Sequence, residues 1–227
     1  MIINNMNLKD LGCDLLRYRI TPSQYSGRSF WNNGAMSPIA VSGQYTFSNL
    51  EVDIYIEGQD SAEVERKKSK LNAMMENPII ILNEVDEGIE YLCYYENQVV
   101  VEKINEVTSI ATYHFKSFKR GLQKEITLSS TSNNVDVVTD VATEAIYEIT
   151  PNVDMVDFAV QGIKIKNLKA NKKIIIDGIK KTVTMDGKNK FSDTEFWSFP
   201  TLTPGTNKIT LSRTDAKVIL RYYPRYV

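Results

Sequence analysis

The chain reads Ile-Ile-Ile-Asp-Gly-Ile-Lys-Lys-Thr-Val-Thr-Met-Asp-Gly over residues 174–187. Each of its two apolar runs ends in an Asp-Gly pair, at 177–178 and at 186–187. Glycine accepts the positive φ that tight turns demand, so Asp-Gly beside strand-forming residues is a strong turn signal. The stretch therefore predicts short strands that reverse direction one after another, as in an antiparallel sheet.

Short strand-like runs continue through the rest of the carboxy-terminal part, separated by Gly, Pro, Asp and Asn. Short strands at this spacing are typical of an antiparallel β-sandwich, which we expect over residues 136–227. The expected strands are Ala145–Ile149, Phe158–Leu168, Lys173–Ile176, Lys180–Met185, Asn207–Leu211 and Ala216–Tyr222.

The amino-terminal part combines strands with one helix, and residues 1–135 are expected to form a mixed sheet or barrel. From Tyr45 to Ile56 apolar and polar residues alternate, apart from one slip, which predicts a half-buried strand. Asp60 with Glu63 three places on predicts a helix start, and the helix is expected over about 60–76. Further strands are expected at Ile79–Leu82, Tyr91–Tyr95, Gln98–Ile104, Val107–Phe118 and Lys124–Leu128.

A polar stretch, Ser-Ser-Thr-Ser-Asn-Asn at 129–134, separates the two patterns. It offers nothing to bury, so we place the domain boundary there, extending to about Asp140. The charge also changes: residues 1–135 hold 17 Asp and Glu against 13 Lys and Arg, and residues 136–227 hold 11 against 14. The sequence predicts two domains, 1–135 and 136–227.

The composition excludes several classes of function. The chain has 227 residues, 24% of them charged, with a net charge of −1, so it lacks the basic excess of a nucleic-acid binder. Cys13, Cys93 and the single His114 are too few for a disulfide framework or a closed zinc site, and no metal or cofactor is expected. The amino terminus lacks the pattern of a secretory signal, and no apolar run reaches the roughly 20 residues of a membrane span.

No residue pattern points to catalysis. The sequence contains no GxGxxG, Walker loop, GxSxG or HExxH motif. His114 falls on the polar face of its strand and is read as a surface histidine, while Cys13 and Cys93 are read as core thiols. Asp193 and Glu195 resemble the carboxylate pair of a glycoside hydrolase, but pairs at this spacing are common by chance. The chain is therefore expected not to be an enzyme, with glycan hydrolysis as a distant alternative.

One aromatic, turn-rich segment stands out: Phe196-Trp-Ser-Phe-Pro-Thr-Leu-Thr-Pro-Gly-Thr-Asn207. Pro204-Gly205 predicts a turn that leads into a new strand. Trp197 and Phe199 are expected to plug one end of the sandwich. A platform on which Trp197 stacks a sugar is the alternative, and it would make the chain a carbohydrate-binding module with a β partner domain.

In the part Phe199–Asn207 of this segment, in the runs at 174–177 and 184–187 and in the closing Arg221-Tyr-Tyr-Pro-Arg225, the chain resembles the distal tail proteins of long-tailed phages, and the resemblance extends over nearly its whole length. The resemblance implies no catalytic residue. It implies structural signature positions at Trp197, Phe199, Pro200, Leu202, Pro204, Gly205 and Asn207.

The resemblance also implies a fold, a location and a set of partners. The amino-terminal domain would form a homohexameric ring that continues the tail tube, and the carboxy-terminal domain would be a galectin-like sandwich at its periphery. The protein would be a virion component, located in the phage tail, joining the tail tube protein to the baseplate or tail tip. It would contact a tail-tip or tail-associated protein and receptor-binding or baseplate proteins, and DNA would pass through its channel without specific binding.

Overall fold

The computed structural model describes residues 1–30, 36, 39–82, 88–96 and 100–227. The chain divides into two compact units, Met1–Arg120 with Val227, and Gly121–Tyr226. Each unit has its own cluster of buried hydrophobic residues. The described part is mainly β with one α-helix, which confirms the predicted fold class. The division falls earlier in the chain than the predicted boundary between residues 135 and 136.

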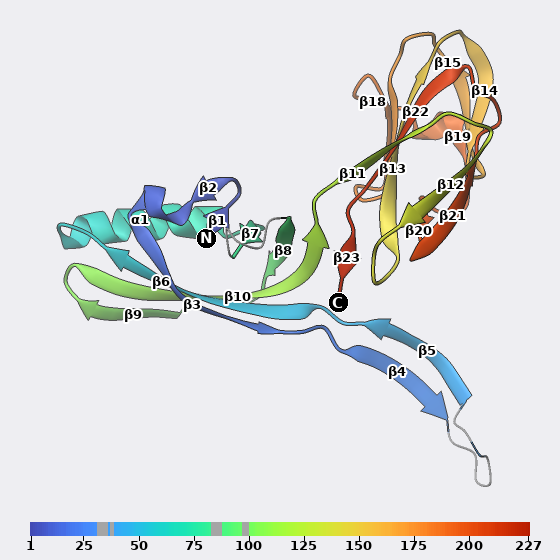
Figure 1. Cartoon of the computed structure of the whole chain (residues 1–227). Helices are drawn as coiled ribbons and strands as arrows, with labels where there is room; N and C mark the ends of the chain where they lie inside the picture. The colour runs from blue at the N-terminus through green and yellow to red at the C-terminus, as the bar shows by residue number, and fades with distance from the viewer. Residues whose placement is uncertain (31–35, 37–38, 83–87, 97–99) are drawn as a thin grey trace. The chain divides into compact units, whose positions relative to one another are not determined.

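The first unit is built on a large sheet in the order β2-β1-β7-β8-β10-β6-β3, with β9 beside β10 (Figure 1). A one-turn 3-10 helix, Leu8–Leu11, connects β2 to β3. The pairs β3–β6, β6–β10 and β9–β10 are antiparallel. The strands are β1 (Ile2–Ile3), β2 (Met6–Asn7), β3 (Cys13–Thr21), β6 (Ser48–Glu57), β7 (Ile79–Ile81), β8 (Ile89–Tyr95), β9 (Val100–Asn105) and β10 (Thr108–Gly121).

The two faces of this sheet differ because strand side chains alternate. On β6, Leu50, Val52, Ile54 and Ile56 belong to the buried cluster that also contains Val64 and Leu71 of helix α1 (Ser61–Met74). The helix therefore covers one face of the sheet. Its start is the predicted one: the Glu63 amide donates to Asp60 Oδ1 at 2.7 Å, which confirms Asp60 as the helix cap.

Strands β4 (Tyr25–Phe30) and β5 (Ile39–Tyr45) form a separate antiparallel pair. Figure 1 shows them as a ribbon that projects from the sheet of the first unit. The Tyr25 and Tyr45 rings meet edge to face, with centroids 5.4 Å apart. A Cβ on Gly43 would lie 1.9 Å from the Tyr25 hydroxyl, so glycine leaves the room that the Tyr25 ring fills.

The second unit is a sandwich of two antiparallel layers, as predicted. One layer has the order β11-β22-β13-β16-β17-β18, with β20 beside β13. The other contains β12-β21 and β14-β15-β19, which an isolated bridge between Val160 and Leu211 links. The strands of the two layers are β11 (Lys124–Leu128), β12 (Ser132–Val137), β13 (Thr143–Pro151), β14 (Met155–Val160), β15 (Ile163–Leu168), β16 (Ile174–Asp177), β17 (Thr182–Met185), β18 (Lys188–Asn189), β19 (Thr194–Glu195), β20 (Thr201–Leu202), β21 (Gly205–Thr210) and β22 (Ala216–Tyr222). The short strand β23 (Arg225–Tyr226) belongs to neither layer.

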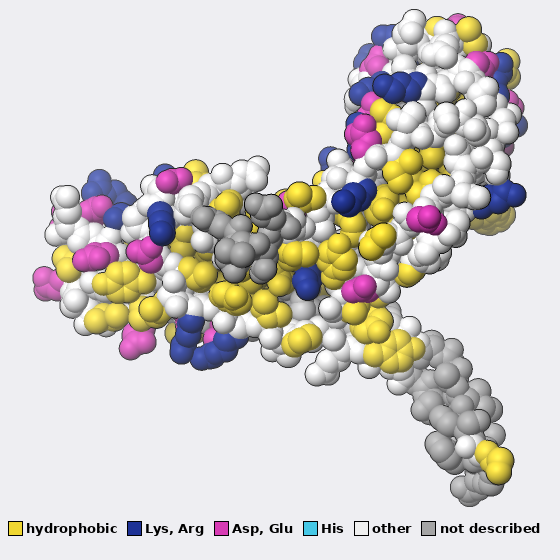
Figure 2. All heavy atoms as spheres, in the orientation of Figure 1, with side chains coloured by type: hydrophobic (Ala, Val, Ile, Leu, Met, Phe, Trp, Pro, Cys, Tyr) yellow, Lys and Arg dark blue, Asp and Glu magenta, His cyan; other side chains and the backbone are white. Residues whose placement is uncertain are grey.

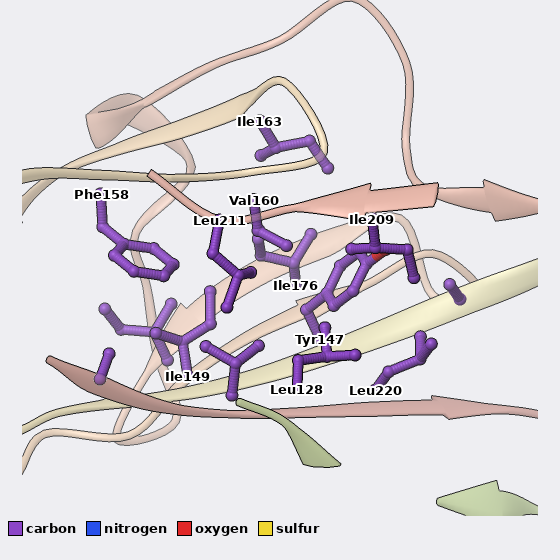
Figure 3. Packing of buried hydrophobic residues seen from close by; sticks show 14 of the residues in the cluster. Leu128, Tyr147, Ile149, Phe158, Val160, Ile163, Ile176, Ile209, Leu211 and Leu220 are labelled. Carbon is purple, nitrogen blue, oxygen red and sulfur yellow. The ribbon is translucent and has the colours of Figure 1, made fainter. Parts of the chain in front are cut away.

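The core of the second unit lies between these layers (Figure 3). Phe158 and Val160 from one layer face Ile149 and Tyr147 from the other. Tyr147 is fully buried, and its hydroxyl donates to Gln161 Oε1 at 2.5 Å. Its polar end is thus satisfied, and burial raises the pKa of the Tyr147 hydroxyl well above its ordinary value.

The polar stretch 129–134 is not the domain boundary that the sequence predicted, since the chain divides between Arg120 and Gly121. The Ser129 and Ser130 amides both donate to Asn133 Oδ1 at 3.2 Å, so the stretch is a closed turn. Ser132–Val137 then continues as β12, and Val135 and Val137 are buried. The prediction rested on the absence of apolar residues from this stretch. It was wrong because the Asn133 side chain, and not apolar burial, holds the turn in place.

Of two other turns in this unit, one was not predicted and one was. The predicted strand Phe158–Leu168 is two strands, β14 and β15, because Gln161 and Gly162 both have positive φ and form a tight turn. By contrast, the Asp186-Gly187 turn is confirmed: φ is 48° and 79° at its two residues, and β17 pairs with β18 across it.

Candidate functional site

The signature segment that follows Glu195 is held to the sandwich at Pro200 and Leu202. The Ala145 amide donates to the Pro200 carbonyl at 3.0 Å, and Leu202 pairs with Thr143 of β13. The Leu202 side chain is 0% exposed and belongs to the core. A Cβ on Gly178 would lie 2.9 Å from the Pro200 carbonyl oxygen, so the turn after β16 packs closely on this segment. These contacts fix the path of the chain into β20.

Pro204 lies in the turn between β20 and β21, and Gly205 and Asn207 lie at the start of β21. Gly205 has a φ of +88°, which side chains disfavour. Asn207 Nδ2 donates to the carbonyls of Thr203 at 2.7 Å and of Gly205 at 2.9 Å, while Asn207 Oδ1 accepts from the Thr203 amide at 3.0 Å. The Pro-Gly-x-Asn pattern therefore has a local structural use, namely to make this turn and close it.

Three phenylalanines pack together beside this segment. The Phe196 and Phe199 rings lie edge to face with centroids 5.0 Å apart, and Phe191 lies 5.6 Å from Phe196. Phe196 and Phe199 pack against the core, as the sequence predicted for Phe199. Lys181 Nζ lies 5.6 Å from the centroid of the Phe199 ring, within range of a cation–π contact.

Trp197 does not plug the sandwich: its exposed fraction is 105%, the whole side chain. The expectation of a core plug was therefore wrong. In the segment Phe196-Trp-Ser-Phe199 the two phenylalanines turn inward, and their anchoring leaves the indole between them outside. Residue type gives only a weak guide here: Phe is more often fully buried than Trp, but Trp is also highly buried on average.

Asp193 and Glu195 are each engaged in an ion pair. Asp193 Oδ2 lies 2.7 Å from Lys190 Nζ, and Glu195 Oε1 pairs with Lys166. The hydrogen bond from Lys190 holds the pKa of Asp193 below its ordinary value, and that from Lys166 does the same for Glu195. A glycosidase acid needs a raised pKa, so this pair does not have the electrostatics of acid and base catalysis.

The other sequence candidates also have plain structural places. His114 lies on the polar face of β10, with Nδ1 3.5 Å from Glu51 Oε2. Cys13 and Cys93 are buried, and burial raises the pKa of Cys93 to about 12, which opposes a thiolate. Among the described residues no cluster of His, Cys, Asp and Glu is suited to a metal ion. None of the described helices has the length and apolar character that crossing a bilayer requires.

A ladder of ion pairs crosses the sheet face opposite α1. Asp53 of β6 accepts from Arg17 of β3 and from Thr112 Oγ1 of β10 at 2.6 Å. Burial alone would raise the pKa of Asp53, but the hydrogen bonds from Thr112 and Arg17 lower it overall. Next along the strands, Arg19 Nη1 lies 2.7 Å from Glu51 Oε1. The cations of this ladder are therefore largely neutralised by neighbouring carboxylates.

Strands β3 and β9 are edges of the first unit's sheet in the part of the chain that is described. Each carries large exposed apolar side chains. Figure 2 shows hydrophobic side chains at the surface around β9. Strand β3 was not predicted, although Leu16-Arg-Tyr-Arg-Ile20 alternates with the period of a strand. The exposed residues are Leu16, Tyr18 and Ile20 on β3 and Val100, Val101 and Ile104 on β9.

The chain is similar to a known protein family and to several solved structures. Residues 138–226 match the family described as siphovirus-type tail component, C-terminal domain. No curated protein matches the chain significantly. The crystal structure of the Dit protein of phage SPP1, described as a paradigm of the hub adsorption apparatus in phages that infect Gram-positive bacteria, is similar with a TM-score of 0.74 at 11% identity, over 100% of this chain and 98% of that one.

Two structures of the phage P2 baseplate in its activated conformation are also similar. The form with Ca has a TM-score of 0.62 at 10% identity, over 94% of this chain and 91% of that one. The form with Sr has a TM-score of 0.57 at 10% identity, over 92% and 90%. At these identities the structures show a shared fold, and with the family match they confirm the resemblance to distal tail proteins.

Proposed function

We propose that this chain, whose residues 138–226 match the family described as siphovirus-type tail component, C-terminal domain, is the distal tail protein of a phage. It is a structural virion protein of the tail, without enzymatic activity, and forms a hexameric hub ring between the tail tube and the baseplate or tail tip. The observation that carries the proposal is the similarity to the SPP1 hub protein over both units, together with the family match.

The free edges of the first unit provide the ring contacts. An exposed strand edge with apolar side chains is an aggregation hazard unless another strand covers it. A ring uses two different surfaces of each copy, and β3 and β9 offer two such edges in one sheet. In the ring, β3 of one copy lies beside β9 of the next, which buries Tyr18 and Ile20 of the first against Val101 of the second.

The ribbon of β4 and β5 supplies a second contact. A two-stranded ribbon alone is marginally stable in water, so its conformation needs support from outside. Tyr25 and Tyr45 pack edge to face and both remain exposed, which leaves aromatic surface available to a neighbouring copy. The ribbon therefore packs on the adjacent copy in the ring.

The ion-paired sheet face lines the channel. Passing DNA would be held by unpaired cations, since phosphate contacts supply most sequence-independent affinity. On this face Arg17 pairs with Asp53, Arg19 with Glu51, and Lys116 Nζ lies 2.6 Å from Glu96 Oε1. DNA then passes without specific binding.

The remaining partners follow from the position of a hub. The ring contacts the tail tube protein on one side and the tail-tip or tail-associated protein on the other. The second unit lies at the periphery, where it can receive receptor-binding or baseplate proteins. Host attachment is thus a property of the assembly that this chain organises.

The rival function, a carbohydrate-binding module, has one observation in its favour, the complete exposure of Trp197. A monomer that binds a sugar weakly through this indole would fit that reading. Sugar binding at Trp197 would not require the strand edges of the first unit, whereas ring assembly would. Variants of these edges therefore distinguish the two functions.

The test is the mass of the full-length chain by light scattering, alone and with tube protein, for the natural sequence and three variants. The natural chain is expected at six copies. Ile20→Lys and Val101→Lys place a charge on each proposed edge and should leave smaller species. Val156→Lys, at an 83% exposed position of β14, is the matched control and should keep six copies. Six copies in all variants would show that β3 and β9 do not form the ring contacts. A dimer of the natural chain would contradict the hexameric ring itself.

A further inference from the structure

Trp197 lies on a loop that is fixed on both sides. Phe196 and Phe199 pack against the core, and the carbonyl of the buried Pro200 accepts from the Ala145 amide. Because its neighbours are anchored, the exposed indole does not result from a loose chain. A large apolar side chain held in water in this way is a strong candidate for a binding residue, since tryptophan is enriched among the residues that dominate protein interfaces.

The shape around Trp197 favours insertion into a partner over binding of a small ligand. An exposed fraction of 105% leaves both faces and the edge of the indole in solvent. A small-ligand site is concave, and buries most of its ligand. Trp197 projects, so a pocket that buries it has to come from the partner.

The charges beside the loop indicate what surrounds that pocket. Most lysines between 164 and 190 are paired with carboxylates, for example Lys164 with Asp157 and Lys172 with Asp186. Lys180 and Lys181, in the turn that packs on Pro200 through Gly178, have no carboxylate within 4.0 Å among the described residues. This turn is therefore a local positive surface, and acidic groups complement it.

We infer that Trp197 is the anchor by which the second unit docks a different virion protein, one with an apolar pocket that has an acidic rim. The two lysines contact the rim, and Phe191, half-exposed beside Phe196, extends the apolar contact. This inference rests on the proposed function, because the partner is a protein of the same tail.

The test replaces Trp197 with the photo-crosslinking residue p-benzoylphenylalanine in chains that are incorporated into phage particles. Val156, also exposed in the second unit, receives the same residue as a control. Illumination of purified particles is expected to link position 197, and not position 156, to one other tail protein. Lys180→Glu with Lys181→Glu should lower that yield at least tenfold in particles that retain the chain.

Each other outcome is decisive. Equal crosslinking at both positions, links within the chain itself, or no link at position 197 would overturn the inference while the hub role stands. A link to saccharide instead of protein would overturn it in favour of a glycan platform. Absence of the natural chain from particles would overturn the hub role, and the docking role with it.

Discussion

The Asn207 side chain and the Thr203 backbone are joined by two hydrogen bonds in opposite directions: the Thr203 amide donates to Asn207 Oδ1 at 3.0 Å, and Asn207 Nδ2 donates to the Thr203 carbonyl at 2.7 Å. One side chain thus closes the turn that carries Pro204 and Gly205. An amide can do this because it has a donor and an acceptor on one planar group.

Asn207→Ala should destabilise the second unit by about 1–2 kcal/mol, because the Thr203 backbone groups lose their partners. Asn207→Asp keeps the acceptor and loses the donor, so its loss should be smaller than that of alanine. Urea unfolding measures both. Asn134→Ala, an exposed asparagine of β12, is the control and should stay within about 0.5 kcal/mol. Equal stability of all variants would show that the turn does not depend on Asn207.

Substitutions at two positions of the same segment should change the stability of the second unit by very different amounts. Leu202→Ala removes a fully buried side chain and should cost about 2–5 kcal/mol. Trp197→Ala removes an exposed one and should change stability by no more than about 0.5 kcal/mol. Thermal unfolding of the two variants checks this. A large loss for Trp197→Ala would mean that the indole is packed.

Glu148 should make the second unit sensitive to acid. It is nearly buried, with Oε1 2.6 Å from Lys173 Nζ and Oε2 2.6 Å from Arg221 Nη1. Burial raises its pKa, but the hydrogen bonds from Lys173 and Arg221 lower it overall. A folded pKa below the unfolded one, about 4.3, gives stability that is present above that pH and lost as pH falls through the folded value.

The measurement is urea unfolding at pH 7 and at pH 3 for the natural chain, Glu148→Gln and Glu125→Gln. Glu148→Gln should lower stability at pH 7 and reduce the loss on going to pH 3. Glu125 pairs with the same Arg221 but is mostly exposed, so Glu125→Gln should behave like the natural chain. An unchanged pH dependence in Glu148→Gln would contradict the assignment.

A fragment that begins at residue 121 should fold, and one that begins at residue 141 should not. The longer fragment keeps β11, which pairs with β22 and brings Leu128 into the core, and β12, which pairs with β21. Removal of both leaves β21 and β22 with unpaired edges and opens the sandwich. Circular dichroism and thermal unfolding of residues 121–227 and 141–227 test this. Equal stability of the two fragments would mean that β11 and β12 are not needed for the second unit to fold, and would favour a domain boundary near residue 135.

The sequence predicted elements whose signals are local and missed those whose order comes from packing or side-chain bonds. Asp60 and the Asp186-Gly187 turn were found because a cap and a tight turn are specified by adjacent residues. Strand β3 could have been predicted from the alternation over Leu16–Ile20, but most of its side chains are exposed, so this alternation does not mark a buried face. The exposure of Trp197 could not be predicted, since it depends on which of several aromatic residues the core accepts.

Electron microscopy of the full-length chain, alone or with tube protein, shows directly whether the hexameric ring forms. We expect six-fold rings with a central hole that admits duplex DNA, roughly 20 Å or more for a duplex whose grooves alone are about 6–12 Å wide. Discrete dimers, rings of another symmetry, or rings formed by residues 121–227 without the first unit would contradict it.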